Sequence, residues 1–253
     1  MLSFSLQSGS NGNAIYVEAA GVSLLFDAGI SGRQAELRLR RRGRDIRQVS
    51  ALLISHEHDD HIRCAGIYQR KFGIPVYATR RTLAETRCPL GSLTDVTHFR
   101  PGDCLDFGPL QVITVPTPHD AAEGVAFVIR EGRRRLGVFT DLGHPFPALL
   151  EWLRKVDAAY LESNYDPHLL RQGPYPEWLK QRIEGPRGHL SNGEAAALVA
   201  RIASKRLRWV VLAHLSEENN SPDLALSTHR AAYGAAVPLY VASRYEPLEP
   251  LEL

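Results

Sequence analysis

Cysteine is scarce in this sequence, and long apolar runs are absent. The 253 residues contain three cysteines, which are odd in number and form no Cys-x-x-Cys pair, so a disulfide framework is excluded. No apolar run approaches the ~20 residues that a membrane span requires, and Met1 to Gln7 lacks the basic start of a secretory signal. We therefore expect a cytoplasmic protein that is neither exported nor embedded in a membrane.

Neither sign of charge is in excess. The chain carries 30 Lys and Arg against 28 Asp and Glu, and its formal net charge of +2 is too small to indicate a nucleic-acid partner by itself. Arginine is nevertheless concentrated in two places, with six residues between positions 38 and 47 and three at 133–135. Such clusters can bind phosphates, but they are also expected if arginine is simply the preferred surface cation of a chain with four lysines.

The composition indicates one globular domain of mixed α/β class over residues 1–253. Hydrophobic residues make up 44% and charged residues 23%, enough for a sizeable core, and no repeat or linker interrupts the chain. Short β-branched runs alternate with helix-period segments, which predicts sheets packed between layers of helices. The predicted strands, of which the first two form a hairpin, are 14–17, 22–26, 51–54, 76–78, 110–115, 125–129, 136–140, 158–161, 209–213 and 238–242.

Four helices have recognisable ends in the sequence. The signals are a capping serine at the start, in one case within a Ser-x-x-Glu capping box, and a glycine at the end. The first predicted helix runs from Ser31 to Gly43, and the second covers 61–72 and ends at Gly73. The third covers 195–205 and follows the capping box of Ser191 and Glu194, and the fourth covers 222–234 and follows Ser221.

Five of the predicted strands each lead to a residue that can bind a metal ion or move a proton. These residues are His56, His119, Asp141, Glu162 and His214. Because α/β proteins build their sites at the carboxyl ends of strands, five such residues are expected to meet in space. The sequence therefore predicts a functional site at this edge of the sheets.

The first of these residues belongs to a dense run of ligands, Ser55-His56-Glu57-His58-Asp59-Asp60-His61, which reads His-x-His-x-Asp-His. At a turn between a strand and a helix, the first two histidines can face one point, while the second aspartate and the last histidine face another point nearby. With His119, Asp141 and His214 the ligands number seven, which exceeds the need of a single ion. They suit two divalent ions of zinc, manganese or iron, about 3.5 to 4 Å apart if Asp141 bridges them.

This pattern resembles the signature of the metallo-β-lactamase superfamily, in which His-x-His-x-Asp-His is followed by a lone His, a lone Asp and a late His. The order in this chain is the same across almost its whole length. The resemblance implies a four-layer αββα sandwich. It also implies that one metal ion binds His56, His58 and His119, that the other binds Asp60, His61 and His214, and that Asp141 lies between them.

Further segments look like the YycJ/WalJ branch of that superfamily. Members of the branch are described as 5′ to 3′ exonucleases on double-stranded DNA that are tied to mismatch repair, so the resemblance implies a DNA substrate and a role in repair. The segments are 8–13 (SGSNGN), 161–166 (LESNYD), 173–176 (GPYP), 188–192 (GHLSN) and 214–220 (HLSEENN).

His189 lies just ahead of the capped helix, in a context similar to the His-Ser/Thr element of RNase Z-type phosphodiesterases. In those enzymes the histidine pairs with a Glu that ends an earlier strand, a position that Glu162 matches. Cleavage of a phosphodiester releases an alkoxide that benefits from a proton, and a carboxylate can keep a histidine protonated. We therefore expect His189, Glu162 and the metal ligand Asp60 to be catalytic. A helix-entry role for His189, and a role for Glu162 in orienting a ligand histidine, stay open.

Three further residues are candidate contacts to substrate phosphate. Arg187 is close to His189 in the sequence, while Ser10 and Asn13 belong to the opening turn. Arginine commonly binds the nucleic-acid backbone. A hairpin turn rich in Gly and Asn explains Ser10 and Asn13 equally well.

Two other functions fit the same residues. A small-molecule or cyclic-nucleotide phosphodiesterase of the PhnP-like kind uses similar ligands, and the sequence shows no obvious substrate arm that would argue against it. A metal-stabilised scaffold that recruits repair partners without chemistry is less compatible with seven ligands, because a scaffold has no use for an open dinuclear site. The sequence gives no indication of the oligomeric state.

Overall fold

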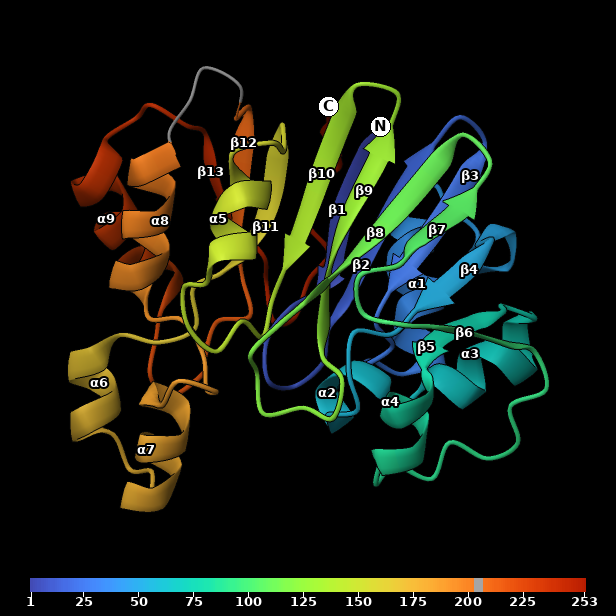
Figure 1. The fold of residues 1–253 in the computed structure, drawn as a ribbon, viewed down its shortest axis with the longest axis horizontal. Helices are drawn as coiled ribbons and strands as arrows, with labels where there is room; N and C mark the ends of the chain where they lie inside the picture. The colour runs from blue at the N-terminus through green and yellow to red at the C-terminus, as the bar shows by residue number, and fades with distance from the viewer. Residues whose placement is uncertain (203–206) are drawn as a thin grey trace.

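Two sheets lie face to face at the centre of the molecule, and helices cover their outer faces (Figure 1). The computed structural model describes residues 1–202 and 207–253. The resulting order of helices, sheet, sheet and helices confirms the predicted four-layer αββα sandwich. None of the helices in these residues has the length and apolar character needed to cross a membrane.

The first sheet contains seven strands. In spatial order they are β14 (Leu251–Glu252), β1 (Leu2–Gln7), β2 (Ala14–Ala19), β3 (Val22–Phe26), β4 (Ala51–Leu53), β5 (Val76–Thr79) and β6 (Val96–Phe99). The pairs from β14 to β3 are antiparallel, and those from β3 to β6 are parallel. The predicted hairpin is confirmed as the β2–β3 pair, in which Ile15 lies opposite Phe26.

The second sheet repeats this plan. Its strands, again in spatial order, are β13 (Leu239–Val241), β12 (Trp209–Ala213), β11 (Ala158–Glu162), β10 (Arg134–Phe139), β9 (Val125–Glu131), β8 (Leu110–Pro116) and β7 (Cys104–Phe107). The pairs from β7 to β10 are antiparallel, and those from β10 to β13 are parallel. Each sheet therefore offers a parallel half whose carboxyl ends can carry a site.

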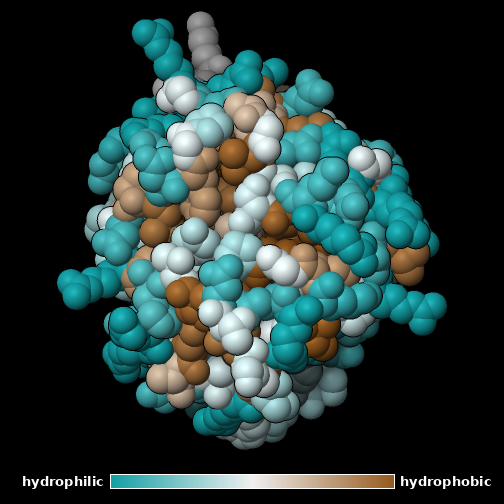
Figure 2. Space-filling model, turned by 90° about the vertical axis from the view of Figure 1, so that its right-hand side faces the viewer, coloured by the Kyte–Doolittle hydropathy of each residue, from teal (hydrophilic) through white to brown (hydrophobic). Residues whose placement is uncertain are grey.

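Helices form the two outer layers. The helices that pack on the first sheet are α1 (Gly32–Arg41) and α3 (Ala65–Phe72), and those on the second are α5 (Pro147–Leu153), α8 (Asn192–Ile202) and α9 (Pro222–Tyr233). The short helices are η1 (Ile46–Gln48), α2 (Asp59–Ile62), α4 (Arg80–Glu85), α6 (Pro167–Gln172) and α7 (Glu177–Glu184). On the side of the molecule drawn in Figure 2, hydrophilic residues cover most of the surface and hydrophobic ones show between them.

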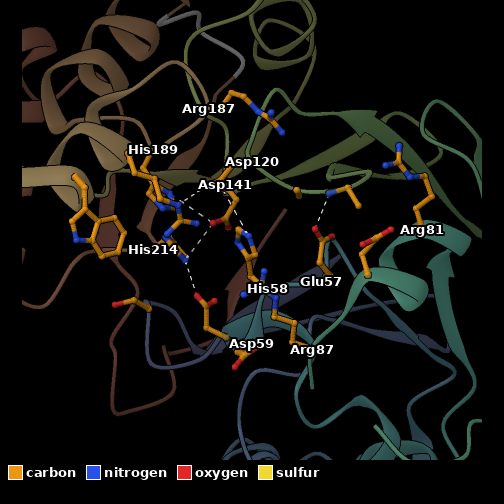
Figure 3. A pocket seen from close by; sticks show the side chains of 17 residues that line it. Glu57, His58, Asp59, Arg81, Arg87, Asp120, Asp141, Arg187, His189 and His214 are labelled. Carbon is orange, nitrogen blue, oxygen red and sulfur yellow. Dashed lines mark hydrogen bonds and ion pairs between the residues drawn. The ribbon is translucent and has the colours of Figure 1, made fainter. Parts of the chain in front are cut away.

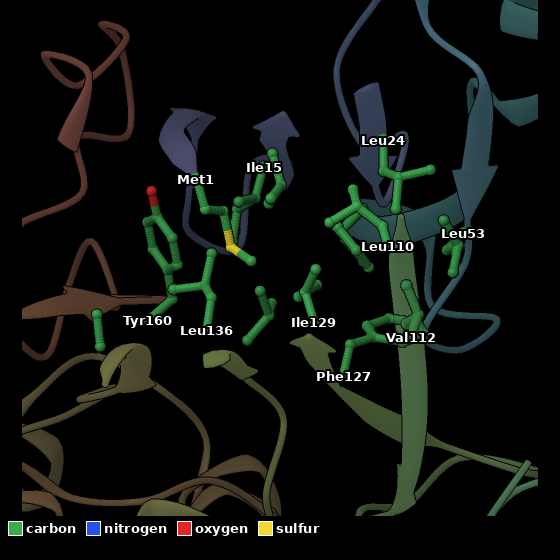
Figure 4. Close-up of a cluster of buried hydrophobic side chains, with 14 of the residues drawn as sticks. Met1, Ile15, Leu24, Leu53, Leu110, Val112, Phe127, Ile129, Leu136 and Tyr160 are labelled. Carbon is green, nitrogen blue, oxygen red and sulfur yellow. The ribbon is translucent and has the colours of Figure 1, made fainter. Parts of the chain in front are cut away.

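Apolar side chains from both sheets fill the space between the two (Figure 4). Phe26 of the first sheet and Phe127 of the second have ring centroids 5.0 Å apart. Because a further layer covers the other side of each sheet, β4 and β12 are buried along their whole length. This double burial explains why such strands are continuous apolar runs in the sequence.

The predicted helix starts are confirmed where hydrogen bonds can be compared. The Ser31 hydroxyl accepts from the Gln34 amide at the start of α1. At α8, the Glu194 carboxylate accepts from the Ser191 amide at 2.9 Å, and the Ser191 hydroxyl accepts from the Glu194 amide at 3.3 Å. This is the predicted capping box, although the helix already begins at Asn192.

Three predictions about secondary structure need correction or comment. The helix predicted over 61–72 is two helices, α2 and α3, separated at Arg63 and Cys64. β1 was not predicted, although five of its six residues are buried, because serines interrupt its apolar pattern. The predicted helix end at Lys205 lies outside the described residues.

Candidate metal centre

The predicted strand-end residues meet at one edge of the sandwich. His56 follows β4 of the first sheet, whereas Asp141, Glu162 and His214 stand at the ends of β10, β11 and β12 of the second. His119 follows β8 and reaches the same place, because its imidazole packs 5.2 Å from that of His56, centroid to centroid. The predicted convergence therefore occurs, although the residues come from two sheets and not from the single common sheet that was expected.

The first group of ligand atoms comes from His56, His58 and His119, whose ring nitrogens lie within 4.8 Å of one another. His58 Nδ1 is 3.3 Å from His119 Nε2. His56 is 1% exposed, and its Nε2 has no hydrogen-bond partner among the described residues. A buried polar atom without a partner is unfavourable, so this nitrogen is suited to bind a cation.

The second group comes from Asp60, His61 and His214, which also lie within 4.8 Å of one another through their ligand atoms. His214 Nε2 is 3.2 Å from Asp60 Oδ2 and 3.4 Å from His61 Nε2. The two imidazoles and the carboxylate point at a common position. The run His-x-His-x-Asp-His thus divides between two groups, as expected for residues on a strand–helix turn.

Asp141 lies between the two groups. Its Oδ2 is 3.2 Å from His61 Nε2, and its Oδ1 is 3.7 Å from His119 Nε2 and 3.5 Å from His214 Nε2. Asp141 is 3% exposed, and Oδ2 has no hydrogen-bond partner in the described part of the chain. Figure 3 shows its carboxylate at the centre, with His58, His189 and His214 around it.

Charges within the cluster keep its carboxylates ionised. Burial alone would raise the pKa of the Asp141 carboxyl, but the imidazoles of His214 and His61 hold it well below its usual range. For His56, burial and the neighbouring His61 lower the pKa well below its usual value, so this ring is neutral and has a free lone pair. Imidazole nitrogens and carboxylate oxygens without thiolates are the donors expected for divalent zinc, manganese or iron, and the cluster is consistent with a dinuclear metal site.

Outer contacts hold the ligand histidines in place. Asp27 Oδ2 is 2.7 Å from His61 Nδ1, and the Gly188 carbonyl is 2.8 Å from His119 Nδ1. A hydrogen bond at Nδ1 orients the ring and leaves Nε2 for a metal. Asp27 was not predicted, yet it directly follows β3 and so carries the same strand-end signal as the residues that were.

Backbone geometry also directs the side chains. Asp27, Asp141 and His214 adopt left-handed φ angles of 65°, 56° and 56°, and each directly follows a strand or lies two residues beyond it. Such angles are uncommon outside glycine, although Asp and His adopt them more readily than most residues. Strained backbone of this kind clusters at functional sites, because it turns a side chain where a regular strand would not.

His189 and Glu162 form the predicted pair beside this cluster. His189 Nδ1 is 2.6 Å from Glu162 Oε1, and the other carboxylate oxygen accepts from the Leu142 amide at 2.9 Å. Burial would lower the pKa of His189, but the fully buried Glu162 carboxylate outweighs that effect and raises it to about 9. His189 Nδ1 is also 3.7 Å from Asp141 Oδ1, so the pair borders the metal cluster.

A cleft of about 1100 Å³ opens above these residues and is lined by Asp141, His189 and His214. It is larger than the ~300–1,000 Å³ of pockets that enclose a small ligand. Ser10 and Arg187 line it, as expected for substrate contacts.

Asn13 is placed differently from Ser10. It is 3% exposed, its Nδ2 lies 3.1 Å from the Gly9 carbonyl oxygen and 3.2 Å from Asp60 Oδ2, and its Oδ1 accepts from the Gly9 amide. These contacts leave its amide no free hydrogen-bonding capacity for a phosphate. We therefore propose that Asn13 supports Asp60 rather than contacting substrate.

Asp120 is a second polar residue that was not predicted. Its Oδ1 is 3.2 Å from His119 Nε2 and has no hydrogen-bond partner within the described ranges, while Oδ2 accepts from Arg182 Nε at 2.5 Å. It directly follows a ligand in the sequence, which is the only signal that would have drawn attention to it. The Arg182 contact links α7 to the loop that carries His119.

The first arginine cluster does not line the cleft. Arg38 is buried and donates to the Leu6 carbonyl at 3.2 Å. Arg41 pairs with Glu246 at 2.7 Å and Arg42 with Glu249 at 2.8 Å. These contacts attach the C-terminal segment to α1, so the structure favours a structural role over phosphate binding for these three arginines.

Comparisons with known proteins agree with this geometry. The profile of the β-lactamase superfamily domain matches residues 23–214. Exodeoxyribonuclease YycJ of Bacillus anthracis is 37% identical over 222 residues, which cover 87% of this chain and 84% of that protein. Exodeoxyribonuclease WalJ of Streptococcus pneumoniae is 34% identical over 227 residues, which cover 88% of this chain and 84% of that protein.

A solved structure extends the likeness to the whole fold. The metallo-β-lactamase fold protein YhfI of Bacillus subtilis matches with a TM-score of 0.75 at 17% sequence identity, over 98% of this chain and 99% of that chain. At this identity the match shows the shared fold alone.

Proposed function

The chain belongs to the metallo-β-lactamase superfamily and is a relative of the YycJ and WalJ exodeoxyribonucleases, and on that basis we propose that it is a 5′ to 3′ exonuclease acting on double-stranded DNA in DNA repair. The names of the relatives support the exonuclease activity. The 5′ to 3′ polarity and the role in DNA repair rest on the resemblance of sequence segments to the YycJ/WalJ branch. We also propose that the protein acts in the cytoplasm and that residues 1–253 form one domain.

The observation that carries this proposal is the 2.6 Å contact between His189 and Glu162 at the edge of the His and Asp cluster. The leaving group in phosphodiester cleavage is a poorly stabilised alkoxide, so the reaction gains from a nearby proton donor. Hydrolysis of a β-lactam or a thioester has less need of such an acid. The pair therefore supports a phosphodiester substrate.

We assign the metal ligands as the sequence suggested. One divalent ion would be held by His56, His58 and His119. The other would be held by Asp60, His61 and His214. Asp141 would contribute to both sites. When bound, two such ions lower the pKa of a water molecule and offset the negative charge that builds up on a phosphate. Zinc, manganese and iron all suit these donors.

The remaining steps belong to side chains of the chain itself. His189 would donate the proton to the leaving oxygen, because Glu162 holds it in the protonated form. Burial would raise the pKa of Asp60, but His61 and His214 keep it well below its usual value. The resulting carboxylate would orient the attacking water as a hydrogen-bond acceptor. Arg187 and Ser10 line the cleft and would contact the substrate backbone.

A nuclease assay on end-labelled duplexes tests the proposal. The purified protein is incubated with zinc, manganese or iron(II) in turn, and with a 5′-phosphorylated duplex labelled at either the 5′ or the 3′ end. Release of labelled mononucleotide from the 5′ end, with progressive shortening of the 3′-labelled strand, is expected in at least one metal.

Three other results would change the assignment. Release of labelled nucleotide only from the 3′ end would show that the protein degrades DNA in the 3′ to 5′ direction. Hydrolysis of bis(p-nitrophenyl) phosphate without any cleavage of DNA identifies a small-molecule phosphodiesterase instead. Full metal binding with no hydrolysis of either substrate identifies the scaffold.

A further inference from the structure

Helices α6 and α7 project from the second sheet beside the cleft, and we call residues 167–184 the arm (Figure 1). No residue of α7 is buried. Trp178 of α7 is 66% exposed, yet it lines the same cleft as Asp141 and His189. The arm was not predicted from the sequence, since α7 is a helix of eight residues with three apolar side chains and none of its residues carries a recognised motif.

Trp178 differs from the other two tryptophans in having no partner. Trp209 is buried and packs 5.8 Å from Tyr160, and the Lys155 amine lies 5.0 Å from the Trp152 ring. No aromatic or cationic group of the described residues packs on the Trp178 ring. A large flat apolar surface is therefore presented to whatever occupies the cleft.

The opposite wall of the cleft carries charges of both signs, because Glu57 and Glu85 line it beside two arginines. Arg81 of α4 and Arg87 just beyond it are exposed and line the cleft, and neither pairs with any described residue. Figure 3 shows Arg81 beyond Glu57, away from His189 and His214, and Arg87 beside His58. Figure 1 shows α4 and α7 on opposite sides of this edge of the sandwich.

The arm is not free to swing at its inner end. Arg182 of α7 contacts the Asp120 carboxylate at 2.5 Å, and the Asp120 amide donates to the Arg187 carbonyl at 3.0 Å. Asp120 directly follows the candidate metal ligand His119. The position of Trp178 is thereby tied to the metal cluster, as required of a residue that aligns a substrate with it.

We propose that the arm and the α4 wall grip a single, unpaired nucleic-acid strand, with Trp178 stacked on a base and Arg81 and Arg87 in contact with phosphates. This inference rests on the proposed nuclease function and specifies its substrate. An aromatic ring cannot stack on a base that lies between two others in a duplex. Opening of the duplex end by at least one nucleotide frees such a base, and we expect this opening before the strand enters the cleft. Aromatic stacking beside a basic wall is the usual means of holding single strands.

Binding of base-free strands tests the role of Trp178. The metal-loaded protein is titrated with fluorescent phosphorothioate single strands that resist cleavage and carry an abasic site at successive positions from the end. At one position, the wild type should bind the intact strand about tenfold more tightly than the abasic strand, a typical effect for one stacked base. In Trp178→Ala this ratio should fall to about one, because no ring is left to stack.

Two controls separate stacking from general damage. Trp178→Phe keeps an aromatic face and should restore most of the ratio. Tyr240→Ala removes another aromatic residue, 39% exposed on β13 and outside the cleft lining. It should leave the ratio and the affinity unchanged.

The salt dependence of binding tests the arginines. Each phosphate contact on a single strand contributes about 0.7 to the slope of log affinity against log salt, so Arg81→Ala with Arg87→Ala should reduce that slope by about 1.4. The double variant Arg154→Ala with Arg230→Ala removes the same charge from α5 and α9, outside the cleft lining, and should leave the slope unchanged.

The outcomes distinguish this inference from the function on which it rests. If the wild type cleaves DNA but Trp178→Ala keeps the full preference for an intact base, the stacking role is wrong and the nuclease assignment stands. If the wild type neither binds nor cleaves any oligonucleotide, yet hydrolyses bis(p-nitrophenyl) phosphate, the nuclease assignment is wrong. The proposed binding of a single strand by Trp178, Arg81 and Arg87 is then wrong as well.

Discussion

The floor of the cleft and its rim are built in different ways. At the floor, five of the seven assigned ligands are buried, with His61 0% and Asp141 3% exposed, and further residues such as Asp27 hold them in position. At the rim, Trp178 is 66% exposed, and Arg81 and Arg87 are exposed without partners among the described residues. The side chains of the floor are held by the fold itself, whereas those of the rim are free to contact a substrate.

This difference separates chemistry from recognition. Groups that bind metal ions and move protons must be held close to their working geometry, which packing and outer hydrogen bonds provide. Groups that bind a chain of variable sequence gain from exposed rings and charges that tolerate many partners. Substitutions at the floor should therefore change whether the protein hydrolyses anything, and substitutions at the rim should change what it hydrolyses.

The largest effect is expected at Asp141. Asp141→Ala removes the carboxylate shared by both ligand groups and should reduce hydrolysis of DNA and of bis(p-nitrophenyl) phosphate to background. Metal content, measured by mass spectrometry of the dialysed protein, should fall as well. Retained hydrolysis with a full complement of metal would refute the dinuclear centre. Trp178→Ala, in contrast, should leave metal content unchanged.

His189 should show a smaller and more selective loss. His189→Ala removes the proposed proton donor and should slow cleavage of DNA by about 10² to 10⁴. Metal content should stay at the wild-type level, because His189 is not among the seven assigned ligands. Bis(p-nitrophenyl) phosphate has an acidic leaving group that needs little protonation, so its hydrolysis should suffer much less. Loss of metal in this variant would make His189 a ligand and end its role as an acid.

Asp27 should have the smallest effect among these floor residues. Asp27→Asn keeps the size of the side chain and tolerates the left-handed backbone, but weakens the support of His61 Nδ1. Metal affinity should fall by about 10- to 100-fold, and excess metal should restore turnover. Competition with a chelator of known affinity measures the change. An unchanged affinity would show that the Asp27 charge does not tune the site, and would weaken the contrast between floor and rim.

Much of the floor could be predicted from the sequence, because its residues carry a local signal. His56 to His61 lie within six positions, and Asp141, Glu162 and His214 each stand at the end of an apolar run. Asp27 carries the same signal after β3 and could have been found by the same rule. The ligand assignments and the roles of His189 and Glu162 stay predictions, although the structure brings all these residues together.

The rim could not be predicted, because its signals are not local. Trp178 becomes meaningful only once the arm is seen beside the cleft, because no motif in the sequence around it marks it as part of a site. The arginines mislead for a related reason. In the dense group between 38 and 47, Arg41 and Arg42 pair with the C-terminal segment, more than two hundred positions away, whereas the inconspicuous Arg81 and Arg87 reach the cleft. Local density of a residue type says little about which surface it faces.

The left-handed backbone at Asp27, Asp141 and His214 has a consequence for anyone who wishes to make this protein more heat-resistant. Glycine adopts such angles without strain, but the relief of about 1 kcal/mol is offset by the greater freedom of glycine in the unfolded chain and, at Asp27, by the loss of the acceptor of the buried Ser55 amide. Each exchange would also delete a side chain on which hydrolysis depends. A screen that selects only for a higher melting temperature should therefore gain little at these three positions, and any variant that it returns there should be inactive.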